Sequence, residues 1–526
     1  MPYSKASNLE NPKINQSLTK VASGSLIIML GLVLGAMLQY GYNLGLARVF
    51  GAKLTGDFVF CLSIVSIAAV IGQLGAQELL LRYIAAYRGS SEQAKLRSVI
   101  LVGITLGLLG SLSAALLVYA SAPWISSLAR KPELEDLLHT MCWFIPLLAA
   151  ITLSANALQS AKRMGRVISL REIGRPFAIV VALLAAWLFS ISFGQFVWLI
   201  NVVLLGIVSL AARFLWSEFR DARTVTGDRE NTWMWIGFSM SVVFMDLFRA
   251  TTGWLDTLIL GFYVPSEEIA LYFAAIRTAL LITIVLGACN AVLSPMAADL
   301  WHRKDITGLD AAFKLTTRWT ALAILPIALS MFLVSDELMA LFGPDYVAAK
   351  PILVTIIIGR TVNGLTGGVT RLLIMTGHQR VELMNTMVTT IAMIGGMSWA
   401  AQSYGMLGVA IVSSAVVIMM NIVKLLEVRW LIGIQPYDAR YLKLVAAASV
   451  ALIAGTLAQI YGTDFSVIAK LITVPLCTAL SYTLVWYLLG IEDEERAIVA
   501  RLPWLQGKLL LTNGKSWVQT KLHTSK

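Results

Sequence analysis

The sequence predicts an all-α membrane protein that crosses the bilayer many times. Of its 526 residues, 58% are hydrophobic and only 13% are charged. A soluble domain carries about 25% charged residues, so this much apolar surface needs lipid around it. Apolar stretches of about 20 residues, each long enough to cross roughly 30 Å of hydrocarbon as a helix, recur between Val21 and Leu489. The polar first 20 residues and the run after them lack the features of a cleavable signal peptide.

The apolar stretches predict about fourteen transmembrane helices. The expected spans are 21–43, 56–81, 98–121, 138–160, 168–190, 194–215, 233–263, 268–297, 316–334, 348–374, 383–403, 407–429, 441–461 and 467–489.

Lys and Arg are distributed unequally between the two ends of these spans. About 32 fall on the tails and on the loops of one side, and cytoplasmic loops are the ones that carry such an excess. The six on the other side are Arg48, Lys53, Arg130, Lys131, Lys350 and Lys470. We therefore expect both termini in the cytoplasm.

The connections between the spans are short, which excludes several classes of function. None is long enough to fold into a separate catalytic domain, so we expect no enzyme activity and no catalytic residue. The four His and four Cys residues are scattered, so no metal site is expected. The net charge of +11 is explained by basic loops, and we expect no nucleic-acid partner.

Segments of the chain recur at a constant offset. Ala155–Val167 resembles Gly368–Val381, and Ala122–Leu134 resembles Ser335–Val347, at offsets of about 213 or 214 residues. A repeat unit with an even number of spanning helices has the same orientation in the membrane as the unit before it. We therefore expect two pseudo-symmetric six-helix lobes, with the substrate between them. The predicted units are an N-terminal tail (1–20), an N-terminal lobe (21–216), a linker (217–232), a C-terminal lobe (233–430), two further helices (431–489) and an interfacial tail (490–526).

Three arginines lie inside apolar spans: Arg249, Arg277 and Arg360. Each costs roughly 2.5 to 3.5 kcal/mol at the centre of a spanning helix, so such residues normally face the protein interior. Guanidinium is always charged and binds phosphate oxygens bidentately. The arginines therefore predict a cationic chamber that holds an anion. Structural contacts with helix-end carbonyls are the alternative for Arg277 and Arg360.

The seventh span places Asp246, Arg249 and Asp256 within an arc of about 80° on one helix face. They form either an ion pair that locks helices together or a wall of the chamber. The two carboxylates are also candidates for taking a proton or a sodium ion, and no other cofactor is expected.

Two further sites are candidates. Gly364, Gly367 and Gly368 form a hinge in the tenth span or a close helix contact. Arg48, at the outer end of the first hairpin, attracts phosphate or sugar acids, or is a solvated loop cation.

Four segments resemble bacterial polysaccharide flippases of the Wzx type. They are LARVFGAKLTGDFVF (Leu46–Phe60), GAQELLLRYIAAY (Gly75–Tyr87), WLDTLILGFYVPSEEIALYFAA (Trp254–Ala275) and LMALFGPDYVAAKPIL (Leu338–Leu353). This resemblance places the chain in the polysaccharide transporter family, within the multidrug/oligosaccharidyl-lipid/polysaccharide superfamily.

The resemblance implies that undecaprenyl-pyrophosphate-linked oligosaccharide moves from the inner to the outer leaflet of the bacterial inner membrane by alternating access. It makes a polysaccharide polymerase and co-polymerase candidate partners. The alternatives are a lipid II flippase and a multidrug/cation antiporter. The antiporter reading is weakened because Val21–Tyr42 contains no acidic residue, which a common pattern in such exporters places there.

Overall fold

The computed structural model describes residues 12–88, 92–220 and 232–490, which are helical apart from short connections and contain no strand. Within these ranges the side chains of 12–30, 32, 244, 245 and 249–252 lie outside the description. Residues 221–231 of the predicted linker and 491–526 of the predicted C-terminal tail lie outside it as well.

The N-terminal half contains eight α-helices and one π-helical turn in its described part. They are α1 (Pro12–Gly72), α2 (Ala76–Arg88), α3 (Gln93–Ala129), α4 (Leu134–Met141), α5 (Phe144–Ser160), α6 (Met164–Ile168), η1 (Ser169–Gly174), α7 (Arg175–Phe189) and α8 (Phe193–Glu218).

The C-terminal half is built in the same way, with two 3-10 turns in its described part. Its elements are α9 (Thr232–Tyr263), α10 (Ser266–Ala279), η3 (Leu280–Ile282), α11 (Thr283–His302), α12 (Ile306–Leu333), α13 (Ser335–Ala340), η4 (Pro344–Ala349), α14 (Lys350–Leu365), α15 (Val369–Met375), α16 (Gln379–Leu431), α17 (Tyr441–Tyr461) and α18 (Val467–Leu488).

The predicted fold class is confirmed. Eleven helices of the described residues are long and apolar enough to cross a membrane. Two of these, α1 and α16, each join two helices across a kink, at Gly51 (φ 75°) and Gly405 (φ 58°). When each of them is counted as two and α9 is added, the helices match the fourteen predicted spans.

Local sequence explains several of the helix boundaries. The hydroxyl of Ser192 accepts a bond from the Gln195 backbone and forms a capping box at the start of α8. Asp305 caps α12 in the same way through the amide of Gly308. The first helix begins earlier than expected, at Pro12 rather than near residue 21. Proline is favoured in the first turn of a helix, and nothing polar in 12–20 breaks the helix.

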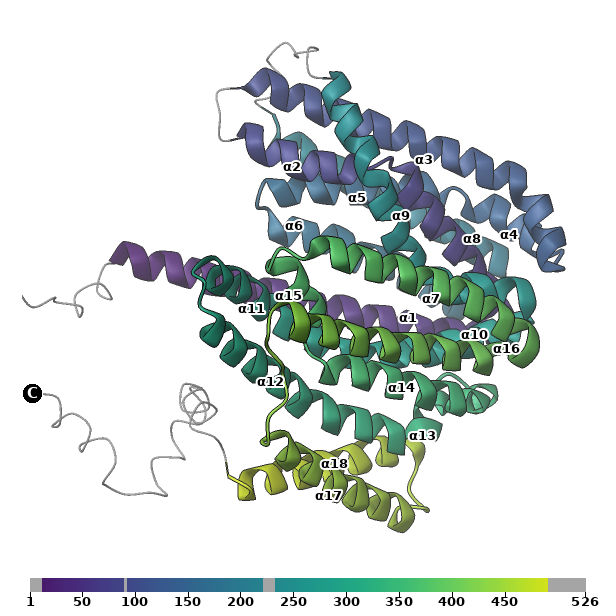
Figure 1. Ribbon diagram of the computed structural model, residues 1–526. Helices are drawn as coiled ribbons and strands as arrows, with labels where there is room; N and C mark the ends of the chain where they lie inside the picture. The colour runs from purple at the N-terminus through teal and green to yellow at the C-terminus, as the bar shows by residue number, and fades with distance from the viewer. Residues whose placement is uncertain (1–11, 89–91, 221–231, 491–526) are drawn as a thin grey trace, which may run out of the picture.

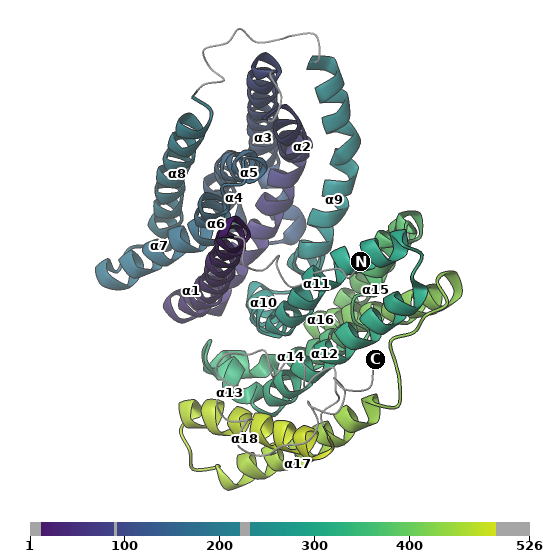
Figure 2. The ribbon, with the colours of Figure 1, turned by 90° about the vertical axis from the view of Figure 1, so that its left-hand side faces the viewer.

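Two groups of helices lie side by side (Figures 1 and 2), with α2–α8 in one and α10–α16 in the other. In addition, α17 and α18 pack together and against α12, at the far edge of the second group. Helix α1 contacts both groups, through α3 and α7 on one side and α10 on the other.

Backbone turns with positive φ recur at the offset of the sequence repeat. Arg130 pairs with Gly343 at 213 residues, and Ser190 pairs with Gly405 at 215 residues. Lys162 and Gly377 form a third pair, again at 215. Three turns of this rare conformation in the same order support the proposed division into two related lobes.

Five of the six cations assigned to the outer side make contacts that join loops at one end of the bundle. Lys53 pairs with Glu133, Lys350 with Asp336 and Lys470 with Glu337. Lys131 and Arg48 donate to backbone carbonyls at this end. We call it the predicted outer end, following the charge distribution of the loops.

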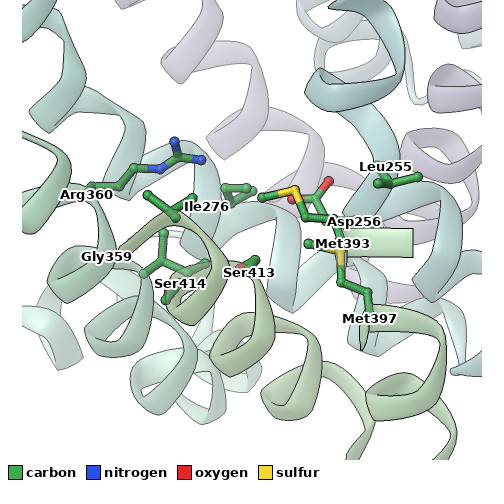
Figure 3. A pocket seen from close by; sticks show the side chains of 11 residues that line it. Leu255, Asp256, Ile276, Gly359, Arg360, Met393, Met397, Ser413 and Ser414 are labelled. Atoms are coloured by element: carbon green, nitrogen blue, oxygen red, sulfur yellow. The ribbon is translucent and has the colours of Figure 1, made fainter. Parts of the chain in front are cut away.

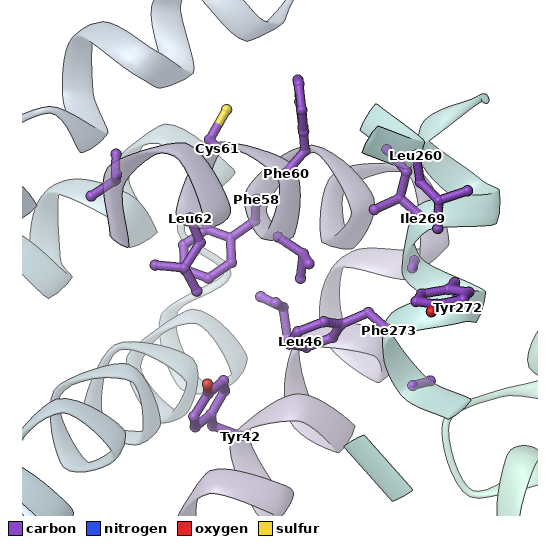
Figure 4. Close-up of a cluster of buried hydrophobic side chains, with 14 of the residues drawn as sticks. Tyr42, Leu46, Phe58, Phe60, Cys61, Leu62, Leu260, Ile269, Tyr272 and Phe273 are labelled. Atoms are coloured by element: carbon purple, nitrogen blue, oxygen red, sulfur yellow. The ribbon is translucent and has the colours of Figure 1, made fainter. Parts of the chain in front are cut away.

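The main hydrophobic core runs from one lobe into the other (Figure 4). Phe58 and Phe60 of α1 lie in the same cluster as Leu260 of α9 and Ile269 and Tyr272 of α10, all of them buried. The two predicted lobes are therefore held together by apolar packing in this region.

Candidate functional site

A cavity of about 240 Å³ lies between α1 on one side and α10, η3 and α11 on the other. Its polar lining comes from Gln39, Tyr40 and Asn43 of α1 and from Arg277 and Thr283 across it. Because α1 belongs to the predicted N-terminal lobe and the other elements to the C-terminal lobe, the cavity has the position expected for a substrate chamber.

Arg277 lies in the last turn of α10, just before the chain tightens into the 3-10 turn η3. Its guanidinium carbon is 4.8 Å from the ring centre of Trp254 and 4.6 Å from that of Phe273. Its Nε is buried and has no hydrogen-bond partner. The aromatic rings stabilise the charge, but a buried donor is left for a ligand to bind.

A second guanidinium, that of Arg175 at the start of α7, approaches the same Trp254 ring at 6.0 Å. Neither Arg175 nor Arg277 forms an ion pair with any residue that the structure describes. Two like charges near one ring repel each other, and an anion bound between them would relieve that repulsion. The sequence analysis missed Arg175 because it was counted among the cytoplasmic cations.

Asn43 is a further polar residue of the cavity that the sequence analysis did not single out. Its side chain is 3% exposed, and neither its Oδ1 nor its Nδ2 has a partner in the structure. Gln39 lies four residues earlier, so the two amides share one face of α1. The signal was present in the sequence as two amides at i and i+4 inside an otherwise apolar span.

Arg360 and Asp256 line a separate cavity of about 40 Å³ between α9, α10, α14 and α16 (Figure 3). The carboxylate of Asp256 accepts bonds from the amide of Thr257 (2.7 Å) and the hydroxyl of Tyr272 (3.1 Å). Arg360 forms no ion pair within the described chain. This space suits water, which needs about 30 Å³ per molecule, rather than a sugar. Arg277 and Arg360 thus line two different cavities in this structure, and a single chamber that holds both stays a prediction.

Asp246 lies deep in the protein, with a side chain that is 2% exposed. Its Oδ2 accepts a hydrogen bond of 2.8 Å from Nε2 of Gln77 in α2, whereas its Oδ1 has no partner. The predicted pairing of Asp246 with Arg249 cannot be placed, because the side chain of Arg249 lies outside the described residues. An unpaired buried carboxylate oxygen is an acceptor for a proton or a cation.

Arg48 makes contacts of a structural kind. Its Nε and Nη2 donate to the carbonyl oxygens of Leu341 (2.7 Å) and Ala340 (2.8 Å), at the C-terminal end of α13. A cation there is favoured by the unsatisfied carbonyls of the helix end. The contact ties α1 to the opposite lobe, and a role of Arg48 in binding substrate stays a prediction.

The three glycines of the predicted hinge surround a break between α14 and α15. Gly367 has φ +69°, and a Cβ there would lie 2.3 Å from Oγ1 of Thr317 in α12. Cβ atoms at Gly364 and Gly368 would meet Ile324 and Leu293 at 2.3 and 2.4 Å. The break therefore coincides with close helix packing, while its movement stays a prediction.

We expect Gly367→Ala to lower thermal stability more than Gly377→Ala. Both residues have positive φ, so both variants strain the backbone, at a cost of order 1 to 3 kcal/mol. Only Gly367 also faces a neighbour, since nothing lies within 4 Å of a Cβ at Gly377. Overpacking adds about 1 to 3 kcal/mol more. Thermal unfolding of the purified proteins measures the difference, and equal melting temperatures would contradict it.

The lobes meet tightly at the predicted outer end. Asp57 accepts a short hydrogen bond from the hydroxyl of Ser266 in α10. A Cβ at Gly56 would come within 1.7 Å of the Ser266 carbonyl oxygen, and one at Gly261 within 1.9 Å of the Phe60 ring.

Lys131 adds a further bridge at this end, because its Nζ donates to the carbonyl of Gly261 at 3.1 Å. Burial lowers the pKa of this ammonium, and the nearby carboxylates of Asp57 and Glu267 partly oppose the shift. The close approaches at Gly56 and Gly261 and the polar bridges of Asp57 and Lys131 together join the two predicted lobes at this end.

Comparison with known proteins supports a family assignment. The sequence pattern of the family described as "Polysaccharide biosynthesis protein" matches residues 21–301, which is more than half of the chain. The chain belongs to this family. A curated relative, "Probable flippase AglR" of Haloferax volcanii, is 28% identical over 120 residues. That match covers 22% of the chain and spans about a quarter (24%) of the relative's own length.

Solved structures show which fold the chain shares. "Lipid II flippase MurJ, inward closed conformation" matches with a TM-score of 0.69 at 15% identity, over 89% of this chain and 100% of that one. An inward-facing multidrug resistance MATE transporter of the MOP superfamily matches with a TM-score of 0.58 at 15% identity, over 78% and 98% of the two chains. These likenesses establish the fold of a multi-pass membrane protein.

Proposed function

We propose that the protein is a flippase that moves undecaprenyl-pyrophosphate-linked oligosaccharide from the inner to the outer leaflet of a bacterial inner membrane. One observation carries the proposal. The cavity between the lobes presents the guanidinium of Arg277, with a buried unsatisfied Nε, beside Arg175, and neither arginine forms an ion pair within the described part of the chain. A diphosphate supplies the negative charge and the acceptor oxygens that this arrangement lacks.

The mechanism that we propose is alternating access. The head group enters the cavity from the cytoplasmic side, while the prenyl chain stays in lipid. The amides of Gln39 and Asn43 offer hydrogen bonds to sugar hydroxyls next to the diphosphate. Binding draws the lobes together on the cytoplasmic side and opens the contact at Gly56 and Ser266. A ligand shifts this equilibrium only by its differential affinity for the two states.

A lipid II flippase is the second candidate, because its cargo presents the same lipid-linked diphosphate to the two arginines. A multidrug/cation antiporter is less favoured, since two unpaired guanidinium groups repel a cationic drug. Vesicles that contain the purified protein and either labelled lipid-pyrophosphate oligosaccharide or labelled lipid II distinguish the three. We expect movement of the first lipid. Movement of lipid II alone would support the second candidate, and export of cationic dye alone would support the antiporter.

We also propose that a proton or sodium gradient drives the cycle through Asp246 rather than Asp256. Asp256 is already bonded by Thr257 and Tyr272, whereas Oδ1 of Asp246 is buried without a partner. We expect Asp246→Asn to abolish stimulation of transport by an imposed gradient, while slow transport down a substrate gradient continues.

The control for this variant is Asp310→Asn, which alters only a partly exposed pair with Lys314. Gradient stimulation measured in vesicles tests the assignment. Full stimulation in Asp246→Asn would show that another residue couples transport to the gradient. Asp256→Asn would then be the next variant to test. In the cell, a polysaccharide polymerase and co-polymerase are proposed partners.

A further inference from the structure

A further cavity, of about 540 Å³, lies within the N-terminal lobe and away from the lobe interface. Helices α3 and α8 both pack on α5, which lies between them (Figure 2). The cavity is a groove with α3 and α8 as walls, and Ala150, Leu153 and Ser154 of α5 line it between them. We call it the α3–α5–α8 groove.

The length of the groove matches one leaflet of a bilayer. Its lining runs from Arg97 to Leu108 on α3 and from Val208 to Phe219 along α8. Eleven residues of helix rise about 16 Å, and half of a hydrocarbon core of roughly 30 Å is about 15 Å. Most of the lining is apolar, with Ile100, Ile104 and Leu215 among its residues. The groove therefore fits a single acyl chain lying along the bilayer normal.

Charge is concentrated at one end of the groove only. Arg97 lies there in the first turn of α3, with Trp216 and Phe219 opposite it at the end of α8. Phe219 also contacts a guanidinium from outside the groove, that of Arg88, 5.8 Å from its ring centre.

Arg88 belongs to a cluster with an excess of positive charge. Arg88, Arg163 and Arg166 all bind Glu218, at 2.6, 2.8 and 3.2 Å, and the Glu218 side chain is only 4% exposed. Because three arginines share one carboxylate, these four side chains together carry a net charge of +2. This cluster and Arg97 stand at the end of the bundle opposite the predicted outer end, where anionic lipids of the cytoplasmic leaflet lie.

We infer that the α3–α5–α8 groove binds one anionic phospholipid of the cytoplasmic leaflet. One acyl chain fills the apolar groove, and the phosphate lies against Arg97 and the positive field of the arginine cluster. The site is independent of the cavity between the lobes and of the proposed cargo.

The test uses the full-length protein, purified in detergent and titrated with phosphatidylglycerol or phosphatidylethanolamine of identical chains, with binding read by native mass spectrometry. Wild type should prefer phosphatidylglycerol. Arg97→Ala should weaken phosphatidylglycerol binding about fivefold, the change expected for one surface cation worth about 1 kcal/mol, and leave phosphatidylethanolamine binding unchanged. Ile104→Trp, which fills the groove, should weaken both.

Arg303→Ala is the matched control, because Arg303 is an exposed arginine that pairs with Asp299 of α11 in the other lobe. It should leave both affinities unchanged. The position of the lipid is tested by fluorescence quenching, because phosphatidylglycerol brominated on its acyl chains should quench Trp216 when a chain lies in the groove. The Trp216→Phe variant gives the quenching that comes from the other tryptophans.

Equal affinity for the two lipids in wild type would overturn the inference, as would an unaltered preference in Arg97→Ala together with unaltered binding in Ile104→Trp. Quenching of Trp216 by a brominated prenyl phosphate but not by brominated phosphatidylglycerol would also overturn it, by assigning the groove to the prenyl chain.

Discussion

Replacing Arg277 by Ala is expected to abolish flipping while the protein still folds and inserts. The side chain forms no ion pair with any described residue, so its removal breaks no salt bridge. Its loss instead removes a charge-assisted bond to the diphosphate. Truncating one partner of a buried charged pair costs about 2 to 5 kcal/mol, which corresponds to a loss of roughly 30-fold or more.

Arg277→Lys separates charge from geometry. Lysine keeps the cation but loses the planar fork that stacks on Trp254 and binds two oxygens. We expect partial activity, between wild type and Arg277→Ala. Arg175→Ala should also reduce transport, because Arg175 shares the Trp254 ring.

Restoration of surface polysaccharide in a flippase-deficient strain measures these effects, with membrane expression checked in parallel. Arg303→Ala, an exposed arginine, serves as the control and should restore polysaccharide fully. Full restoration by both Arg277→Ala and Arg175→Ala would falsify the role of this cavity.

Replacing Gly56 by Ala is expected to open the predicted outer end of the protein. Its new Cβ would lie 1.7 Å from the Ser266 carbonyl oxygen and 2.5 Å from the carbonyl carbon, which are backbone atoms. The lobes would have to separate there, at an overpacking cost of about 1 to 3 kcal/mol. Since 1.4 kcal/mol is a factor of ten in an equilibrium constant, the ratio of open to closed protein at this end should rise about tenfold.

Accessibility of the cavity measures this change. With the four native cysteines replaced by alanine, Asn43→Cys places a thiol in the cavity between the lobes. A charged thiol reagent added from outside should label it about tenfold faster in Gly56→Ala. Gly41→Ala, in the same helix with no atom within 4 Å of its Cβ, should not alter the rate. Unchanged labelling in Gly56→Ala would show that this contact does not close the cavity.

Most of the helices could be predicted because each satisfies its backbone within its own segment. Composition and segment length thus indicate a spanning helix without knowledge of its neighbours. The predicted span 441–461 coincides with α17, and the predicted span 467–489 matches α18 to within one residue. The first helix was harder to delimit, because Pro12–Lys20 is polar yet helical, and hydropathy marks the part in lipid rather than the end of the helix.

The site was predictable only in part. Arg277 could be identified because a cation in an apolar span is costly wherever it points. Arg175 could not, because it lies near the end of a span, where an arginine is ordinary. Arg277 and Arg360 line two different cavities, and their joint role in one substrate chamber stays a prediction. Sequence gives the depth of a residue in the membrane, but not the side of the helix bundle that it faces.

The sequence alone determined that the chain is a many-helix membrane protein, because this feature depends on local hydrogen bonding and segment hydrophobicity. Its division into two related lobes, which rests on the sequence repeat, stays a prediction. Only the tertiary structure decided that Arg175 and Arg277 meet at Trp254, that Arg360 stands apart beside Asp256, and that Arg48 binds the end of α13. Arg175 and Arg277 are about a hundred residues apart in the chain. Such contacts follow from how whole helices pack against one another, which no local pattern in the chain encodes.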